Sequence, residues 1–545
     1  MRRYVAMVVF FAISFVAVEL SVSYLQPLPV RQFNPPGGFS EQRAIQDIEV
    51  FARIPHPYGS AANLAVQNYL VDRLTALQTK PKAEILPGKP AGRAASANYI
   101  LAKVPGLNSS SPIMLACHFD SVPMGPGTSD DGASVASLLE VARDLRIGVP
   151  LKNDVYLLIT NKEELGSLGA KAFAINGGVP ANVKLVGNFE ARGSYGPSLM
   201  FETSDNNGDL ITSFKKFAPH PVSSSIFPAV YHTMPNGTDF TIFKSVGLKG
   251  FNFAYINGIR DYHHSTDNLR NIDPRSLQSQ GDNVLALAEY YGHNDYHETD
   301  TGDATFFVIP QYGMVAYGLD WAYGLAAATV LLFGALIVFM LRRRAEGKRT
   351  DVNLRSLGGA IVSAILALVF AMLVAEIVSR LAYSFFGAKR IVPDGQVYLV
   401  VLQSLSFGAV WLSIWATRKL ISVSSHALSH MALWLAGSIA LAATMPAASY
   451  ILVLPLLFVA AAWILYTALP THRLWATFVS LVAFSAAGFC SLILLTPILS
   501  LGFTALTLNK APMILVLCYL VSGLFVPVIL TITRADQAII TKEES

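Results

Sequence analysis

The stretch CHFDSVPMGPGTSDDGAS, residues 117–134, places a histidine and two adjacent aspartates in a turn rich in glycine and proline. The apolar run SPIMLA, residues 111–116, comes directly before it and predicts a buried strand. Three side chains that are able to bind a metal therefore lie at or near the end of this strand. They form a site only if other parts of the chain supply matching residues at neighbouring strand ends.

Strands and helices alternate through residues 40–295. Apolar periodicity predicts helices over residues 40–54, 61–78, 132–147, 167–175 and 271–292. It predicts strands over residues 96–106, 111–119, 153–161, 182–191 and 248–256. This alternation predicts an α/β fold, a mixed and mostly parallel sheet with helices on both faces. Asp131 lies where the helix over 132–147 begins, and we expect it near the N-cap of that helix.

Candidate ligands follow four of these strands, at the carboxyl ends where α/β sheets bind their ligands. They are His118 with Asp130, then Glu163 and Glu164, then Glu190, and finally His263 or His264. Each has an ordinary structural explanation alone: a structural histidine, an aspartate cap, a solvated loop. Together, two histidines and three or four carboxylates suit two divalent ions bridged by a carboxylate and a water. Of two adjacent glutamates, one is able to bind a metal while the other acts on the water.

Composition divides the chain into a polar part and an apolar part. It has 545 residues, of which 53% are hydrophobic and only 14% are charged, fewer charges than soluble domains carry. Residues 30–310 have ordinary polarity, whereas residues 315–535 are nearly continuous apolar blocks. The net charge of +4 is concentrated in short clusters beside those blocks, which indicates membrane topology and not a nucleic-acid surface. Cys117 is the one cysteine of the polar part, so this part cannot form an internal disulfide. Its cysteine content therefore does not indicate whether the domain lies in an oxidising or a reducing compartment.

The apolar blocks predict the following domains: 1–28 a transmembrane anchor, 29–310 an extracytoplasmic domain, 311–535 a multi-span domain, and 536–545 a cytoplasmic tail. A cleaved signal peptide is the alternative for the first segment, and both explanations export the domain because Arg2 and Arg3 precede the block. About seven further spans are predicted, at 317–341, 357–383, 397–417, 427–446, 449–469, 474–496 and 512–533. The basic run at 342–349 agrees with this orientation, and Glu376 and Arg380 are expected to pair on one helix face.

The four strand-end motifs resemble those of the M28 family of co-catalytic zinc peptidases. The matching segments are HFDSVPMGPGTSDDGAS (118–134), NKEELGSLGA (161–170), NFEARG (188–193) and YHHSTDN (262–268). The resemblance covers residues 40–295 and implies a zinc aminopeptidase-like fold. The multi-span part is similar, more loosely, to the endoplasmic reticulum metallopeptidase and vacuolar membrane protease branch.

This resemblance implies two zinc ions and a role for each motif residue. Five residues are implied as metal ligands, with Asp130 bridging the two ions: His118, Asp130, Glu164, Glu190 and His263. Glu190 departs from the aspartate of many members, and the family spacing favours Asp130 over Asp131 and His263 over His264. Glu163 is implied as general base, Asp120 as the residue that orients His118, and Asp267 as the acidic residue after the last histidine.

Two further assignments are weaker. Tyr262 is a candidate to stabilise the oxyanion, with packing as its alternative. Asp239, in MPNGTDFTIF (234–243), resembles the family's substrate-side loop and is a candidate for contact with substrate or fold.

The sequence thus predicts a membrane-bound dizinc exopeptidase acting on peptides, with aminopeptidase favoured over carboxypeptidase by family frequency. The alternatives are an inactive receptor or scaffold, a single-zinc aminoacyl cyclase of similar fold, and a transporter with an accessory peptidase. The expected partners are a peptide and the lipid bilayer, without nucleic acid; the oligomeric state is not predicted. The bacterial inner membrane facing the periplasm is favoured over an endoplasmic reticulum or vacuolar membrane facing the lumen.

Overall fold

The computed structural model describes residues 2–31, 37–79, 82–84, 98–234, 237–345, 352, 354–386, 395–469, 474–506 and 510–543. The chain forms two compact units. The α/β unit comprises Leu25–Val308 and Gly313–Gly318, and the helical unit comprises Met1–Tyr24, Ile309–Tyr312 and Leu319–Ser545. Residues 346–349 of the predicted basic run lie outside the described residues.

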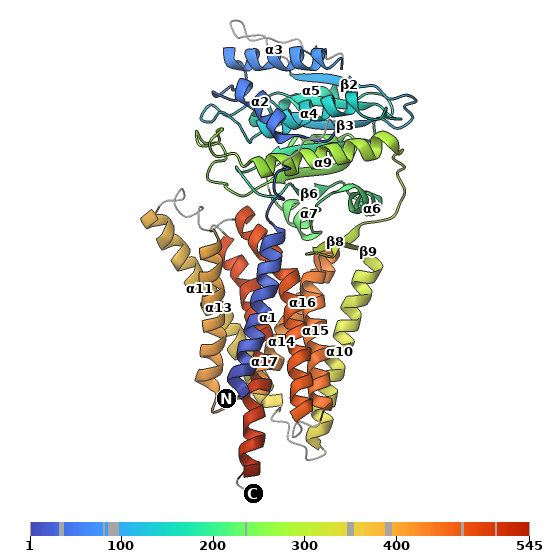
Figure 1. The fold of residues 1–545 in the computed structure, drawn as a ribbon. Coiled ribbons are helices and arrows are strands. Elements are labelled where there is room, and N and C mark those ends of the chain that lie inside the picture. The colour runs from blue at the N-terminus through green and yellow to red at the C-terminus, as the bar shows by residue number, and fades with distance from the viewer. Residues whose placement is uncertain are drawn as a thin grey trace. The chain divides into compact units, whose positions relative to one another are not determined.

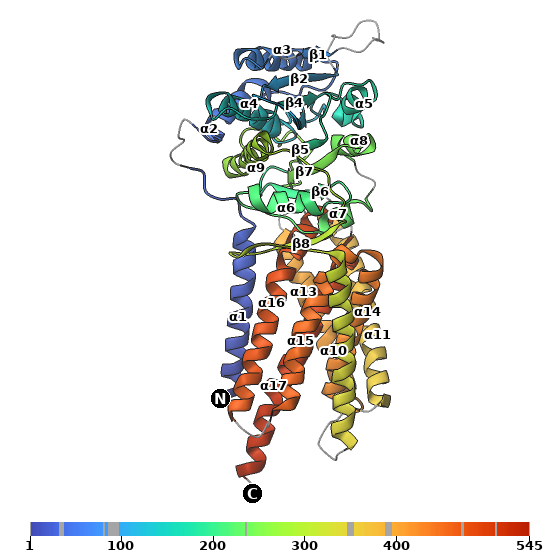
Figure 2. The same ribbon diagram turned by 90° about the vertical axis from the view of Figure 1, so that its right-hand side faces the viewer.

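A seven-stranded sheet in the order β1-β2-β4-β3-β5-β7-β6 forms the centre of the α/β unit (Figure 2). β4, β3, β5 and β7 run parallel to one another, and β1, β2 and β6 pair antiparallel. The bounds are β1 Lys82–Glu84, β2 Tyr99–Val104, β3 Ile113–His118, β4 Val155–Thr160, β5 Leu185–Ala191, β6 Leu199–Thr203 and β7 Lys249–Tyr255. The five predicted strands are all present, and the predicted mixed, mostly parallel sheet is confirmed.

Helices cover both faces of this sheet, as predicted. α2 (Glu41–Phe51), α4 (Gly132–Ile147) and α9 (Pro274–His293) lie on one face, and α5 (Leu168–Ile175) and α8 (Asp239–Ser245) on the other (Figure 2). α3 (Ala61–Ala76), α6 (Gly208–Phe217) and α7 (Ile226–Tyr231) complete the unit. Residues of the central strands are buried on both sides, which explains why their sequences are continuous apolar runs and not alternating ones.

Alternation along the strands gives each face its own core. The larger core packs Leu115 and Phe189 against α4 and α9, and the smaller one packs Met114 and Val186 against Phe240 and Phe243. His118 and Glu190 follow the period of two from Met114 and Val186, so both project on the side of the smaller core.

Several elements are absent from the sequence prediction. They are β1, β6, α6, α7, and the hairpin of β8 (Ala304–Ile309) and β9 (Gly313–Gly318). The predicted substrate-side loop at 234–243 is a helix from Asp239 onward, because Thr238 forms a capping box with Thr241.

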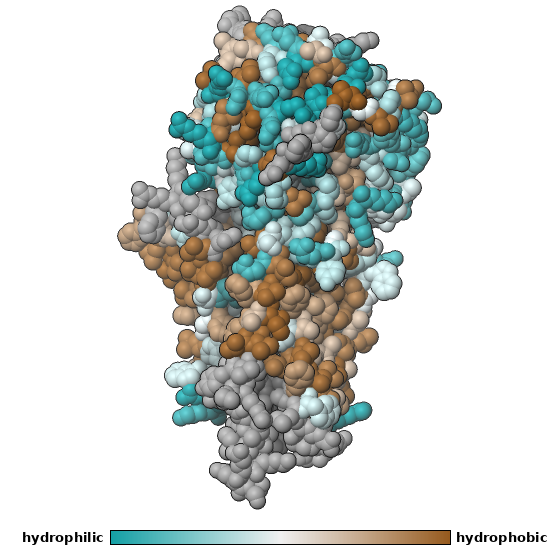
Figure 3. Space-filling model, in the orientation of Figure 1, coloured by the Kyte–Doolittle hydropathy of each residue, from teal (hydrophilic) through white to brown (hydrophobic). Residues whose placement is uncertain are grey.

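The helical unit consists of α1 (Arg2–Tyr24), α10 (Leu319–Ala345), α11 (Leu354–Phe386), α13 (Gly395–Thr417), α14 (Val423–Thr444), α15 (Tyr450–Ala468), α16 (Leu474–Leu506) and α17 (Ala511–Glu543) (Figure 1). Among the described residues, six helices from α10 to α16 are long and apolar enough to cross a membrane, and Val8–Tyr24 and Ala511–Pro527 are shorter apolar helices. Apolar side chains cover much of the helices' surface on the face in Figure 3. α17 continues through most of the predicted tail, and the predicted Glu376–Arg380 pair is confirmed at 2.6 Å.

Candidate metal centre

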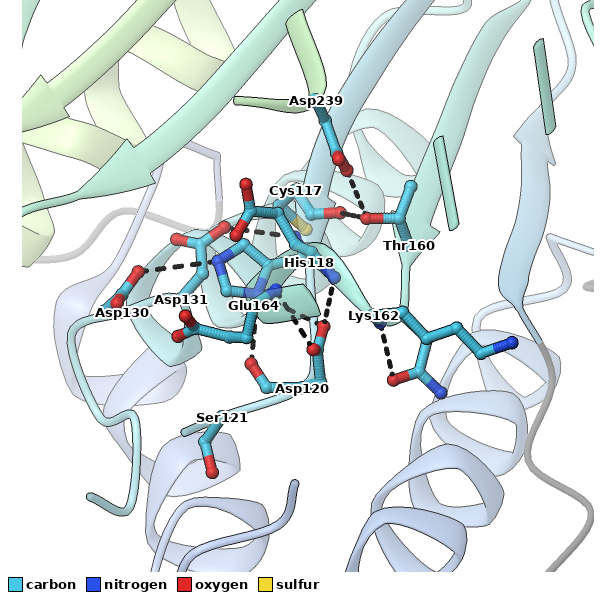
Figure 4. Close-up of polar contacts among 12 residues, drawn as sticks. Cys117, His118, Asp120, Ser121, Asp130, Asp131, Thr160, Lys162, Glu164 and Asp239 are labelled. Atoms are coloured by element: carbon cyan, nitrogen blue, oxygen red, sulfur yellow. Dashed lines mark hydrogen bonds and ion pairs between the residues drawn. The ribbon is translucent and has the colours of Figure 1, made fainter. Parts of the chain in front are cut away.

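His118 is the last residue of β3, and its ring is fixed by the chain that follows it. Its Nδ1 lies 3.0 Å from the backbone carbonyl oxygen of Asp120 and 3.6 Å from the carboxylate of the same residue. The ring is therefore held mainly by the carbonyl, and Nε2 is directed toward Asp130 (Figure 4). The carboxylate of Asp120 instead accepts the backbone N–H groups of Glu163 and Glu164, at 3.0 and 3.3 Å. One residue thus joins the ends of β3 and β4.

Asp130 contacts two histidines through its two carboxylate oxygens. Its Oδ1 lies 3.4 Å from Nε2 of His118, and its Oδ2 lies 3.2 Å from Nε2 of His263. Each histidine has a second carboxylate beside it. Nε2 of His118 is 3.6 Å from Oε2 of Glu190, and Nε2 of His263 is 3.0 Å from Oε2 of Glu164. Asp130 therefore lies between two histidines that each have one further carboxylate beside them. Among the described residues, two groups have ligand atoms that all lie within 4.8 Å of one another: His118 with Asp131 and Glu190, and His118 with Asp130 and Glu164.

These separations match the spacing of ligands around a metal ion. Ligand bonds to zinc of about 2.1 Å in a tetrahedron place neighbouring ligand atoms about 3.4 Å apart. Within the described part of the chain, Oε1 of Glu164 is buried and has no hydrogen-bond partner. Such atoms are costly to bury unless another group satisfies them, and a cation does so. The donor set of histidines and carboxylates therefore fits zinc.

Glu163 lies beside this cluster but outside its contacts with the histidines. It begins the short helix η1 (Glu163–Leu165) after β4, and its Oε1 accepts a hydrogen bond of 3.2 Å from the hydroxyl of Ser167. Glu164 instead lies beside His263, so the two neighbouring glutamates have different surroundings.

Asp267 holds the loop that carries Asp130. Its two carboxylate oxygens accept the backbone N–H groups of Ser129 and Asp130, at 2.7 and 3.1 Å. Because Asp267 follows His263 by four residues, this connection fixes two ligand-bearing loops against each other.

The remaining candidates have different surroundings. The ring of Tyr262 stacks on that of His263, with centroids 3.7 Å apart. Nδ1 of His264 lies 2.7 Å from the carbonyl oxygen of Tyr262, apart from the ligand contacts described above. Asp239 is buried and accepts a hydrogen bond from the hydroxyl of Thr160 at the end of β4, which is a contact with the fold (Figure 4).

The segment that carries this site matches a known protein family. Residues 99–288 match the sequence model of peptidase family M28. This segment contains all of the site residues described above. Residues 99–288 are a peptidase family M28 domain.

Relatives of the chain are named as membrane or reticulum peptidases. A vacuolar membrane protease from Candida tropicalis is 29% identical over 406 residues, covering 71% of this chain and 43% of the relative. Endoplasmic reticulum metallopeptidase 1 from Mus musculus is 29% identical over 299 residues, covering 53% of this chain and 33% of the relative. The chain spans less than half the length of these relatives.

Solved structures resemble the chain at low identity. An aminopeptidase from Aneurinibacillus sp. strain AM-1 is 13% identical, with 48% of this chain and 96% of that chain covered and a TM-score of 0.38. A glutaminyl cyclase from Porphyromonas gingivalis is 18% identical, with 46% and 98% covered and a TM-score of 0.37.

Electrostatics of the M28 domain site follow from the burial of many carboxylates. Burial raises the pKa of Glu164 to about 7, and it raises the pKa of Glu163 well above its ordinary range. Burial lowers the pKa of His263, but its contacts with Asp130 and Glu164 outweigh burial and raise this pKa to about 10. Metal-free, the site therefore retains protons where cations are able to replace them.

Two residues make contacts in the M28 domain site that were not predicted. Asp131 precedes α4 as expected, but it makes no capping hydrogen bond, and its Oδ2 accepts the backbone N–H of His118 at 3.1 Å. Asn188 donates to Oε1 of Glu190 at 3.0 Å. Its position two residues before Glu190 in a strand places it on the same face, and this spacing was a signal that the sequence offered.

Proposed function

We propose that this chain is a membrane-anchored dizinc exopeptidase, and we favour an aminopeptidase. The observation that carries the proposal is the position of Asp130, whose two oxygens contact two histidines that each have their own glutamate. A single-zinc site needs only one of these groups. The presence of both groups supports two ions, and the M28 domain supports peptide hydrolysis.

Each residue then has a defined task. His118 and Glu190 would hold one zinc, His263 and Glu164 would hold the other, and Asp130 would be shared by both. Two zinc ions supply Lewis-acid activation of a water and of the peptide carbonyl when bound. Glu163 accepts a proton from the attacking water and passes it to the amine nitrogen as the C–N bond breaks. Tyr262, beside His263, donates to the carbonyl oxygen as negative charge develops on it.

The helical unit anchors the M28 domain in a bilayer. The basic residues Arg2 and Arg3 and the run at 342–349 remain on the cytoplasmic side, which places the M28 domain on the opposite side. This side is the periplasm if the membrane is a bacterial inner membrane, and the lumen if it belongs to the endoplasmic reticulum or vacuole.

Two adjacent substitutions test the proposal. The full chain is purified in detergent as wild type, Glu163→Gln and Glu164→Gln, and its zinc content is measured by mass spectrometry. We expect two zinc ions in the wild type and in Glu163→Gln, and fewer in Glu164→Gln. We also expect Glu163→Gln to lower kcat by roughly 10²- to 10⁴-fold, the contribution of a general base.

The substrates in this test distinguish the possible activities. Peptides with a free amino terminus and a blocked carboxyl terminus are compared with the reverse, and glutaminyl peptides are tested for cyclisation. Cleavage of only the first set supports an aminopeptidase. One zinc with cyclisation supports the aminoacyl cyclase instead, and absence of both metal and hydrolysis supports a scaffold.

A further inference from the structure

A row of polar residues crosses three strands beside the candidate metal centre. Asn188 of β5 is the registered neighbour of Asn252 of β7, and Asn252 is the registered neighbour of Glu202 of β6. Asn188 and Asn252 have no exposed surface, and Glu202 is 5% exposed. Buried polar side chains reduce stability unless they are hydrogen-bonded, so this row needs an explanation.

Hydrogen bonds connect the row to Glu190 at one end and to Lys244 at the other. Nδ2 of Asn188 donates to Oε1 of Glu190 and to Oδ1 of Asn252, both at 3.0 Å. Nδ2 of Asn252 donates to Oε2 of Glu202 at 2.9 Å. The other oxygen of Glu202 accepts from the ammonium group of Lys244, on α8, at 2.5 Å.

The charge of Glu202 determines which way both amides point. An ionised carboxylate only accepts hydrogen bonds, so Asn252 presents its NH₂ group to Glu202 and its carbonyl oxygen to Asn188. Asn188 then presents its own NH₂ group, and its two hydrogens reach the two acceptors, Asn252 and Glu190. Every member of the row is thus oriented in one direction, from Lys244 to Glu190.

We propose that Asn188 is a positioning residue for the metal centre, oriented through Asn252 by Glu202. It binds Oε1 of Glu190 and leaves Oε2, which lies 3.6 Å from Nε2 of His118, as the one oxygen for the metal. This explains how the glutamate serves where the resemblance leads one to expect an aspartate: the amide holds the longer side chain in place. The inference rests on the proposed dizinc function.

The first test compares two buried asparagines. Asn188→Ala and Asn153→Ala are made in the full chain, since Asn153 is also fully buried but bonds to Ser110, Ser111 and Tyr291. The two zinc dissociation constants are measured by titration, and Co²⁺ absorption spectra report the ligand geometry. We expect Asn188→Ala to weaken one zinc by roughly 10- to 100-fold and to change the Co²⁺ spectrum, as the loss of a residue supporting a ligand does. Asn153→Ala lowers only the melting temperature.

A double-mutant cycle makes the test specific for Glu190. In a Glu190→Asp background, the shorter carboxylate no longer reaches the amide, so we expect Asn188→Ala to change zinc affinity by less than about threefold. The isosteric change Glu202→Gln should weaken the same zinc, because it removes the acceptor-only group that orients Asn252.

Four results would each overturn the inference or a part of it. Unchanged zinc affinities and spectrum in Asn188→Ala, or equal losses in both backgrounds of the cycle, exclude positioning of Glu190 while leaving the dizinc function intact. An unchanged affinity in Glu202→Gln beside a loss in Asn188→Ala excludes orientation through Asn252. A wild type that binds no metal removes the proposed function itself and this inference with it.

Discussion

Asp130 and Asp131 are adjacent in sequence and buried together, yet they have separate tasks. Asp130 faces His118 and His263, whereas Asp131 binds the backbone N–H of His118. Only the three-dimensional path of the turn separates them, since both are aspartates before a helix. The family spacing favoured Asp130 as the bridge, and its contacts with both histidines support this hypothesis.

His263 and His264 are adjacent, and we predict that only His263 is needed for zinc binding. We expect His263→Gln to remove the zinc shared with Glu164, because Nε2 of His263 faces both carboxylates of that group. His264→Gln should retain two zinc ions and most of the activity, since its Nδ1 contacts a backbone carbonyl. Metal analysis of both purified variants is the measurement. Loss of zinc from His264→Gln with retention in His263→Gln would reverse the assignment.

At the scale of elements, the hydrogen bonds of Asp267 connect the loop that carries Asp130 to the loop that carries His263. Asparagine in its place retains one acceptor oxygen, so one of the buried N–H groups of Ser129 and Asp130 loses its partner. We expect Asp267→Asn to cost about 2 kcal/mol locally, and hydrogen exchange across residues 121–131 to accelerate roughly 30-fold.

Asp273→Asn is the control for this prediction. Asp273 caps α9 by accepting the N–H of Arg275, so its substitution removes a carboxylate of the same unit without touching the Asp130 loop. Equal exchange rates across 121–131 in Asp267→Asn and the wild type would show that the loop is held by other contacts.

The central strands were predictable from the sequence because their burial is uniform. β3 and β5 are covered on both faces and therefore read as continuous apolar runs. β6 is an edge strand of five residues with a register irregularity between Met200 and Glu202, and this irregularity interrupts its pattern. α8 was also not predicted from the sequence, because its first residues follow a Pro-Asn-Gly segment that indicates a turn.

The same distinction applies to the site. Ligands at strand ends were predictable because parallel strands bring their carboxyl ends to one edge. The contact of Asp131 with the backbone of His118 was not, because it depends on the path of the turn before α4. The contact between Asn188 and Glu190 could have been predicted from their spacing along one strand, whereas the pairing of Asn188 with Asn252 depends on strand register. The sequence therefore indicates candidate ligands more readily than it indicates what orients them.

At the scale of the whole molecule, the division into two compact units predicts that metal binding stabilises only one of them. All of the candidate ligands belong to the α/β unit, and the described helices of the other unit supply none of them. Zinc should therefore stabilise the α/β unit and not the helical unit. Hydrogen exchange with and without a chelator is expected to differ within the described residues of the α/β unit and to be unchanged in α10–α17.

The stabilisation of the domain by zinc should increase with pH, and the direction follows from the pKa values of the buried groups. Burial raises the pKa of Glu164, Asp239 and Asp267 to about 7, above the value of about 4 in an unfolded chain. Metal-free, the folded domain binds more protons than the unfolded chain between these values, so its stability falls as pH rises from about 4 to 7. His263 adds the same trend, since the stability from its raised pKa is lost as pH rises toward about 10.

Zinc reverses this trend because it takes the place of the protons that the site loses. We expect the chelator to lower the melting temperature of the M28 domain more at pH 8 than at pH 6, in the full chain in detergent. Glu164→Gln is the matched variant: it removes one ligand and one buried charge, so it should be more stable than the metal-free wild type at pH 8 and gain less from zinc. A chelator effect that is equal at both pH values would show that the carboxylates and histidines of the site do not exchange protons for metal.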